Sequence, residues 1–232
     1  WEHAAPGRLG IGETQETVFR VPEGSIGFWA HRFVEQGVPH EVPVKRFGET
    51  VLSFRDPDGM RLALVGLPGV EKEPAWAEGG IPAEHALRGF HSVSLLLAEA
   101  APTAAILSDV FGFAEIGRED TLIRYAAKGT TVGGVIDLRV AGGFLPARQG
   151  AGSVHHIALA SPDEDHLAWQ ARVRVAGGYA TAVVNRNYFR SIYFREPSGV
   201  LCDAATLSPG SAASVEPPPL CVEQRLPTDA TP

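Results

Sequence analysis

The sequence predicts an α+β fold built from repeated βαβββ units whose curved, mixed sheets pair with one another. Three observations predict it: an internal repeat at an offset of 140 residues, the same order of strand and helix patterns within each copy, and a weaker third copy between the two. The chain has 232 residues and is 44% hydrophobic, which is enough apolar material for a sizeable core.

The repeat aligns residues 16–63 with residues 156–203 without a gap. Ten of these 48 positions are identical, where average composition would give about three by chance. The identical pairs are Pro22/Pro162, Trp29/Trp169, Arg32/Arg172, Gly37/Gly177, Val44/Val184, Arg46/Arg186, Phe54/Phe194, Arg55/Arg195, Pro57/Pro197 and Gly59/Gly199. Because the matches include prolines, glycines and a tryptophan, they indicate a shared local structure.

Each copy begins with a short apolar run that ends at a proline, and such a run is typical of a buried strand. These runs are Thr17–Val21 and His155–Ala160. Apolar residues at helical spacing follow and stop at glycine, a common helix end. Two extended segments then lead into the turns Asp56–Gly59 and Glu196–Gly199, each of which closes a hairpin into the final strand.

A weaker copy fills the middle of the chain. Phe90–Leu97 has the pattern of a strand and Ala101–Val110 that of a helix. Three more strands are predicted over Phe113–Ile116, Thr121–Ala126 and Gly134–Val140. The order is again strand, helix and three strands.

The chain therefore divides into three units, which are residues 14–66, 89–141 and 153–207. Residues 1–13 are a remnant or linker, residues 67–88 are a linker rich in Pro, Gly and Glu, and residues 208–232 are a Pro-rich tail. Since three is an odd number, one sheet lacks a partner within the chain. We expect a homo-oligomer such as a dimer, or an additional segment, to cover its apolar face.

Composition excludes several classes of protein. A net charge of −7 argues against nucleic acid or an anionic membrane as the main partner. No apolar run approaches the roughly 18 residues that a membrane span needs, and the N-terminus lacks a signal-peptide pattern. The two cysteines form no CxxC pair, which removes support for a zinc knuckle or a redox dithiol. We expect a cytoplasmic protein.

The densest group of chemically capable residues lies in the last unit, with His155 and His156 on its first strand and Asp203 on its last. Neighbouring strand residues point to opposite faces, so one of the two histidines can face a given metal. If the two strands are neighbours, that histidine and Asp203 converge. Two histidines and a carboxylate are the ligand set of non-haem Fe(II), and here the third ligand is open. The alternative is a structural His–Asp hydrogen bond.

The three-fold unit resembles the vicinal-oxygen-chelate superfamily, which includes glyoxalases, bleomycin-resistance proteins and extradiol dioxygenases. Residues 1–209 more closely resemble the ring-cleaving dioxygenases that act on hydroquinones and catechols. The stretches that carry this resemblance are Val21–Ser25 with Phe28-Trp29, Gly134–Leu138, Gly152–Ala158 and Asn185–Pro197. The resemblance implies the glyoxalase/extradiol dioxygenase-like fold and an enzyme that cleaves a small aromatic diol with O2.

The resemblance also implies roles for particular residues. His156 matches an iron ligand of that family, and Asp203 matches a glutamate ligand. His155, Arg186 and Tyr193 match residues that line the substrate pocket, hold the phenolate and assist proton transfer. The implied cofactor is Fe(II), with Mn(II) as the alternative.

Two departures from the family pattern stand out. The family has four units, of which the first supplies a further histidine ligand, and that first unit has no counterpart in this sequence. The aspartate at position 203 is also shorter than glutamate by one methylene, or roughly 1.5 Å of reach. Metal–oxygen bonds tolerate about 0.2 Å of error, so a backbone shift or a bridging water would be needed.

Other interpretations stay open at this point. The protein could be a glyoxalase-like metal lyase or isomerase, or a metal-free small-molecule-binding module like the bleomycin-resistance proteins. His91 opens the middle unit and precedes Asp137 by 46 positions, close to the 47 between His156 and Asp203. A four-ligand site, or a triad of His91, His156 and Asp203, would form if the second and third units paired directly. The hydroquinone-type family instead pairs its inner units with each other and its outer units with each other.

Overall fold

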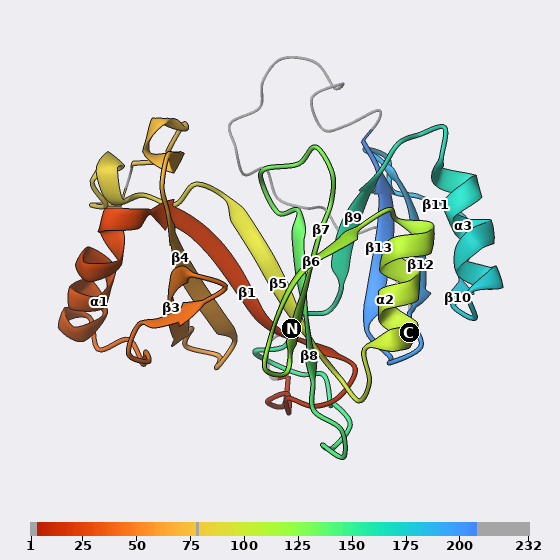
Figure 1. Cartoon of the computed structure of the whole chain (residues 1–232), viewed down its shortest axis with the longest axis horizontal. Helices are drawn as coiled ribbons and strands as arrows, with labels where there is room; N and C mark the ends of the chain where they lie inside the picture. The colour runs from red at the N-terminus through yellow and green to blue at the C-terminus, as the bar shows by residue number, and fades with distance from the viewer. Residues whose placement is uncertain (1–3, 78, 208–232) are drawn as a thin grey trace.

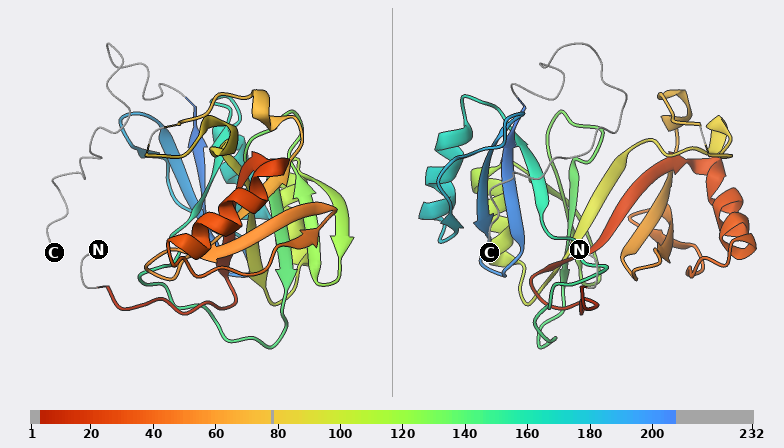
Figure 2. Two further views of the ribbon diagram at one scale, coloured as in Figure 1. Left: turned by 90° about the vertical axis from the view of Figure 1, so that its left-hand side faces the viewer. Right: turned by 180° about the vertical axis from the view of Figure 1, so that it is seen from behind.

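The computed structural model describes residues 4–77 and 79–207, so the predicted Pro-rich tail lies outside the described residues. Two curved sheets lie side by side, with one helix at each end of the long axis and a third helix in front of the smaller sheet in this view (Figure 1). The view from behind shows the same arrangement (Figure 2). The α+β fold of paired, curved mixed sheets is therefore confirmed.

The larger sheet has eight strands in the order β2-β3-β4-β1-β5-β8-β7-β6 and joins the first two units. The first unit contributes β1 (Glu13–Pro22), α1 (Ile26–Glu35), β2 (Val44–Arg46), β3 (Glu49–Arg55) and β4 (Arg61–Leu67). The middle unit contributes β5 (Phe90–Leu97), α2 (Ala101–Ala105), a π-helical turn (Ile106–Val110), β6 (Ala114–Glu119), β7 (Leu122–Ala126) and β8 (Val135–Val140). The two units meet where β1 pairs antiparallel with β5.

The last unit forms a sheet of its own, in the order β10-β12-β13-β9 with β11 beside β12. Its elements are β9 (Ile157–Ser161), α3 (His166–Val175), β10 (Tyr179–Ala180), β11 (Val184–Asn185), β12 (Arg190–Arg195) and β13 (Leu201–Thr206). The second and third units are therefore not joined strand to strand. Among the described residues, no strand pairs with the outer edge of β9, which is the edge that β1 and β5 use to pair with each other.

One difference from the predicted elements affects the site. The strand expected to begin at His155 begins at Ile157, so both histidines precede it in irregular backbone. The helix expected over Ala101–Val110 is present, but its second half is a π-helical turn.

The hairpin turns have the predicted chemistry. Gly59 has a φ of 87° and donates its N–H to the Asp56 carbonyl, and Gly199 has a φ of 104° and donates to the Glu196 carbonyl. These left-handed conformations favour glycine over residues with a Cβ. Both turns set the register of the strands that follow them.

The main core lies between the middle and last units. Phe111, after the π-helical turn, stacks with Phe194 of β12 at a ring-centroid distance of 5.6 Å and packs edge-on to Trp169 of α3 at 4.8 Å. Residues of both units belong to this one buried cluster, whereas the first unit has smaller clusters around Leu52 and Val65. Packing therefore fixes the last sheet against the middle unit even though their strands do not pair.

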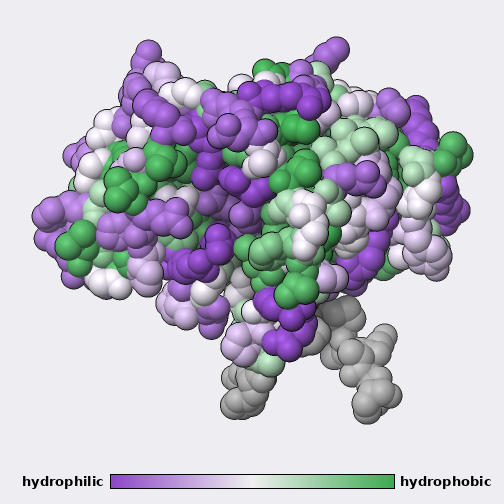
Figure 3. Space-filling model, turned by 60° about the horizontal axis from the view of Figure 1, so that its bottom comes forward, coloured by the Kyte–Doolittle hydropathy of each residue, from purple (hydrophilic) through white to green (hydrophobic). Residues whose placement is uncertain are grey.

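Two further observations describe the molecule as a whole. In the described ranges, no helix is long and apolar enough to cross a membrane. The bottom of the molecule mixes hydrophilic and hydrophobic residues, with a hydrophilic group near the middle of that face (Figure 3).

Candidate functional site

The last sheet brings His156 and Asp203 to the same face. β13 pairs parallel with β9, and Asp203 lies opposite Ala158. His156 comes just before β9, and its ring packs edge-on to Tyr193, the residue directly opposite Asp203 on β12. The predicted neighbourhood of the first and last strands is confirmed, and it places an imidazole and a carboxylate side by side.

The two histidines contact each other, which the strand prediction did not allow. Their Nδ1 atoms lie 3.0 Å apart, and their rings are nearly perpendicular. The expectation that they point to opposite faces is wrong because they precede β9 and escape its alternation. One Nδ1 must donate a hydrogen bond and the other must accept it, so this contact fixes the tautomer of both rings. The Nε2 atom of His156 takes no part in the contact and is left for another partner.

Asp203 is a buried carboxylate with one unsatisfied oxygen. It is 2% exposed, its Oδ2 accepts a 2.9 Å hydrogen bond from Ser191 Oγ, and its Oδ1 accepts none from the described residues. Burial raises the pKa of Asp203, while the hydrogen bond from Ser191 and the charge of His156 oppose that rise. A cation at Oδ1 would relieve this cost of burial.

Tyr193 and Arg186 lie beside this pair. Tyr193 of β12 is directly opposite Asp203 of β13, and its ring packs edge-on to His156 at a centroid distance of 5.5 Å. Arg186 donates from Nη2 to the Tyr193 hydroxyl over 3.3 Å. Burial lowers the pKa of His156, against the attraction of Asp203, so the neutral imidazole that binds metals is favoured.

All five predicted site residues therefore gather on one face of the last sheet. Ser191 belongs with them and was missed from the sequence, although its place two residues before Tyr193 on β12 could have indicated it.

The donors suit a metal ion as two ligands of a larger set. His156 Nε2 and Asp203 Oδ1 are the available atoms, and a buried carboxylate oxygen without a donor is what a cation would satisfy. Across the described ranges, no three His, Cys, Asp or Glu residues come together as a metal-binding group. A third protein ligand is not present among these residues.

The middle unit does not form a matching site. Asp137, on β8, lies opposite Ser94, so the counterpart of His156 there is Ser92, and His91 is one position out of register. Arg124 holds the fully buried Asp137 through two bonds, from Nε to Oδ1 at 2.8 Å and from Nη2 to Oδ2 at 2.9 Å.

His91 lies in the same network, on the larger sheet. It contacts Ser92 Oγ at 2.9 Å and Glu49 Oε1 at 3.5 Å, while Glu49 also accepts from Arg124 at 2.6 Å. The four-ligand and His91-containing alternatives required direct pairing of the second and third units, which the structure does not have. In the middle unit, Arg124 instead binds the carboxylate of Asp137.

Comparison with known proteins gives the family. MhqO of Bacillus subtilis (strain 168), provisionally named a ring-cleaving dioxygenase, is 37% identical over 213 residues, or 91% of this chain and 67% of MhqO. The chain belongs to the ring-cleaving dioxygenase family. This family member is also 29% identical over 205 residues to the chlorohydroquinone/hydroquinone 1,2-dioxygenase of Sphingobium indicum, which covers 86% of the chain and 64% of that enzyme. A scan against protein-family models matches none.

Solved structures agree with the sequence relatives. A provisionally named dioxygenase from Bacillus subtilis superposes on this family member with a TM-score of 0.82 and 36% identity, over 90% of this chain and 67% of that one. Glyoxalase I of Zea mays superposes with a TM-score of 0.61 and 15% identity, over 88% of this chain and 69% of the maize chain. The maize enzyme shows the shared fold, so the expected glyoxalase-like fold is confirmed.

Proposed function

We propose that the protein is an extradiol-type, ring-cleaving dioxygenase of a small aromatic diol such as hydroquinone or catechol, with Fe(II) as cofactor and O2 as second substrate. The observation that carries the proposal is the meeting of His156 with the half-satisfied carboxylate of Asp203, in a chain 37% identical to a relative provisionally named a ring-cleaving dioxygenase. Mn(II) is the alternative metal for these donors.

Each protein residue has a distinct task in this proposal. His156 Nε2 and Asp203 Oδ1 would hold the metal, and Ser191 fixes the other carboxylate oxygen. A bound Fe(II) supplies Lewis-acid chemistry and a template for a phenolate and O2. Since its Nδ1 is engaged with His156, the exposed His155 would take or give a proton at Nε2. Arg186 and Tyr193 present the N–H and O–H donors that hold a phenolate oxygen.

We also propose that a second copy of the chain completes the site. Within residues 4–77 and 79–207, no strand pairs with the outer edge of β9, which lies next to the two histidines. A strand added there would occupy the position that β5 has beside β1, and it could bring the third ligand. Light scattering should then find a dimer, and a monomer that still binds iron tightly would contradict this step.

The function is tested by oxygen uptake after anaerobic loading with Fe(II). Hydroquinone and catechol should each be tried, with His156→Ala, Asp203→Ala and a control, His31→Ala. His31 is an exposed histidine of α1 whose side chain is 74% exposed, so its loss removes an imidazole far from the site. We expect wild type and His31→Ala to consume oxygen and both site variants to lose at least about a hundredfold in rate.

The same experiment separates the alternatives. Turnover of a thiol adduct with bound Ni or Zn, and no oxygen uptake, would favour a glyoxalase-like lyase or isomerase. Binding of the aromatic diol without any metal would favour a metal-free binding module. Oxygen uptake that His156→Ala leaves intact would overturn the assignment of the site.

A further inference from the structure

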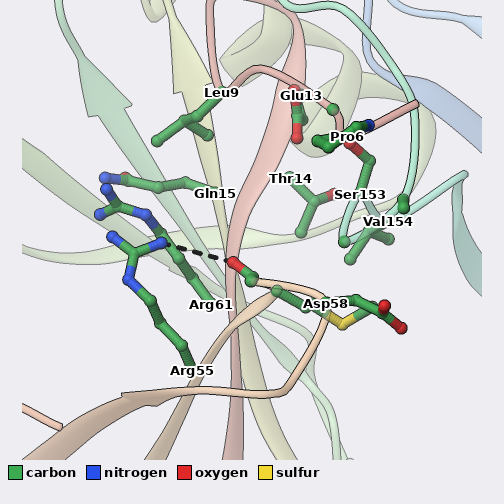
Figure 4. A pocket seen from close by; sticks show the side chains of 15 residues that line it. Pro6, Leu9, Glu13, Thr14, Gln15, Arg55, Asp58, Arg61, Ser153 and Val154 are labelled. Carbon is green, nitrogen blue, oxygen red and sulfur yellow. Dashed lines mark hydrogen bonds between the residues drawn. The ribbon is translucent and has the colours of Figure 1, made fainter. Parts of the chain in front are cut away.

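A cavity of about 260 Å3 lies at the start of β1, and its lining includes none of the residues of the candidate metal site. Its walls come from four segments: residues 6–9, the first residues of β1, the turn between β3 and β4, and residues 151–154 (Figure 4). Small-molecule pockets begin at roughly 300 Å3, so this volume suits a small ligand.

Two buried acceptor atoms of the wall have no partner. Glu13 is 5% exposed and its Oε2 accepts no hydrogen bond from the described residues, and the same is true of Gln15 Oε1. Burial raises the pKa of Glu13, opposed by a hydrogen bond from Ser153. Buried polar groups are nearly always hydrogen-bonded, so these two atoms indicate that a donor is to be supplied from the cavity.

Two arginines lie at one end of the same cavity. Arg55 and Arg61 are directly opposite each other across the hairpin of β3 and β4, and their guanidinium groups gather beside the Gln15 amide (Figure 4). Like charges directly opposite on paired strands destabilise a sheet. Among the described residues, no carboxylate lies within 4.0 Å of either guanidinium.

The acidic residues nearby do not neutralise this pair. Arg55 and Arg61 also border a smaller cavity, of about 130 Å3, whose wall includes Glu16 and Glu41. Glu16 is already engaged by Arg46 at 2.5 Å and by Ser53 at 2.8 Å. In the described part of the chain, the other acids of the two walls, Glu13, Asp58 and Glu41, form no ion pair with either arginine. The arginine pair therefore keeps its capacity to bind an anion.

Comparison of the first and last units shows that Arg61, unlike Arg55, has no arginine counterpart in the last unit. Arg55 donates to the Gly59 carbonyl at 3.3 Å, and its counterpart Arg195 donates to the Gly199 carbonyl at 2.7 Å, so this arginine has a structural bond in both units. The residue opposite Arg195 is Leu201, whereas the residue opposite Arg55 is Arg61. The fold of the unit does not require the second guanidinium.

We propose that this cavity is a binding site for a small hydroxylated carboxylate. The carboxylate would lie against Arg55 and Arg61, which offer bidentate donors, and a ligand hydroxyl would donate to Gln15 Oε1 or Glu13 Oε2. The site uses no metal and none of the residues of the proposed reaction, so it stands or falls separately from that function.

Calorimetric titration with three probes tests the site: 4-hydroxybenzoate, salicylate and lactate, each to about 10 mM. The neutral 4-hydroxybenzyl alcohol is the ligand control. The variant is Arg61→Leu, which introduces the residue that the last unit has at this position, and Arg118→Leu is its control because Arg118 is an exposed arginine paired with Glu115. The thermal midpoint of each variant checks that it is folded.

We expect at least one probe to bind wild type and Arg118→Leu alike, and Arg61→Leu to lose at least about tenfold in affinity. The neutral 4-hydroxybenzyl alcohol should not bind. Gln15→Leu should weaken the binding of 4-hydroxybenzoate more than that of benzoate, which lacks the hydroxyl group. His156→Ala should leave the affinity unchanged, which separates this site from the proposed metal site. No saturable binding of any probe, or equal binding by wild type and Arg61→Leu, would overturn the proposal.

Discussion

The strongest prediction concerns the buried ion pair of Arg124 and Asp137. The side chain of Asp137 is 0% exposed and that of Arg124 is 6% exposed, and two charge-assisted hydrogen bonds join them. Removing one partner of such a pair costs about 3–5 kcal/mol, because the other charge stays buried. The loss of unfolding free energy for Asp137→Ala should be near the lower end of this range, because Arg124 keeps its ion pair with Glu49. The loss for Arg124→Met should be near the upper end, because Asp137 then loses both hydrogen bonds.

Urea unfolding of the two single variants and of the double variant Arg124→Met/Asp137→Ala measures this coupling. The double variant should cost at least about 3 kcal/mol less than the sum of the singles, because no buried charge is left alone in that pair. Arg118→Met is the matched control: its ion pair with Glu115 is exposed and should contribute less than about 1 kcal/mol. Single-variant losses below about 1 kcal/mol, at an unchanged denaturant slope, would refute the reasoning.

Two further predictions concern packing and pH. A Cβ added at Gly66 would meet Ile26 Cγ1 at 2.9 Å, so Gly66→Ala should destabilise the protein by about 1–3 kcal/mol, whereas Gly27→Ala, with open space on α1, should stabilise it by up to about 1 kcal/mol; thermal unfolding that ranks the two in the opposite order would contradict the packing argument. Burial alone would raise the pKa of Glu49, but hydrogen bonds from His91 and Arg124 outweigh it and hold the pKa below the usual value of 4.5. A lowered folded-state pKa stabilises the protein above the unfolded-state pKa and loses that effect as pH falls through the folded-state value. The stability gap between wild type and Glu49→Gln should therefore narrow between about pH 5 and pH 3, and a gap that widens there would show that the sign is wrong.

Much of the fold could be predicted from the sequence because its signals are local. The turns at Gly59 and Gly199 require positive φ, and that requirement is visible in single residues. The strand and helix order follows from apolar spacing, as in Phe90–Leu97 and α1. The convergence of His156 and Asp203 followed from one assumption, that the first and last strands of a unit are neighbours, and β9 and β13 satisfy it.

The rest depends on where a strand starts and on what faces it from another unit. A two-residue shift in the start of β9 put His155 and His156 in contact instead of on opposite faces. His91 seemed to match His156 because of its sequence distance from Asp137. The pairing of β5 with β8 shows that Ser92, one residue later, is the true counterpart of His156. Arg124 lies 13 residues before Asp137 on the adjacent strand, and Glu49 joins it from the first unit, so neither local pattern predicts that network.

The first and last strands pair in the same register in all three units, so the location of His156 and Asp203 has a counterpart in each of the other two units. The strand positions that hold His156 and Asp203 in the last unit hold Glu16 and Ala63 in the first, while the middle unit has Asp137 satisfied by an arginine. The three units thus share a backbone register while the side chains at this location differ from unit to unit. The acids of the first two copies form internal ion pairs, and the last copy has a carboxylate oxygen without a partner among the described residues.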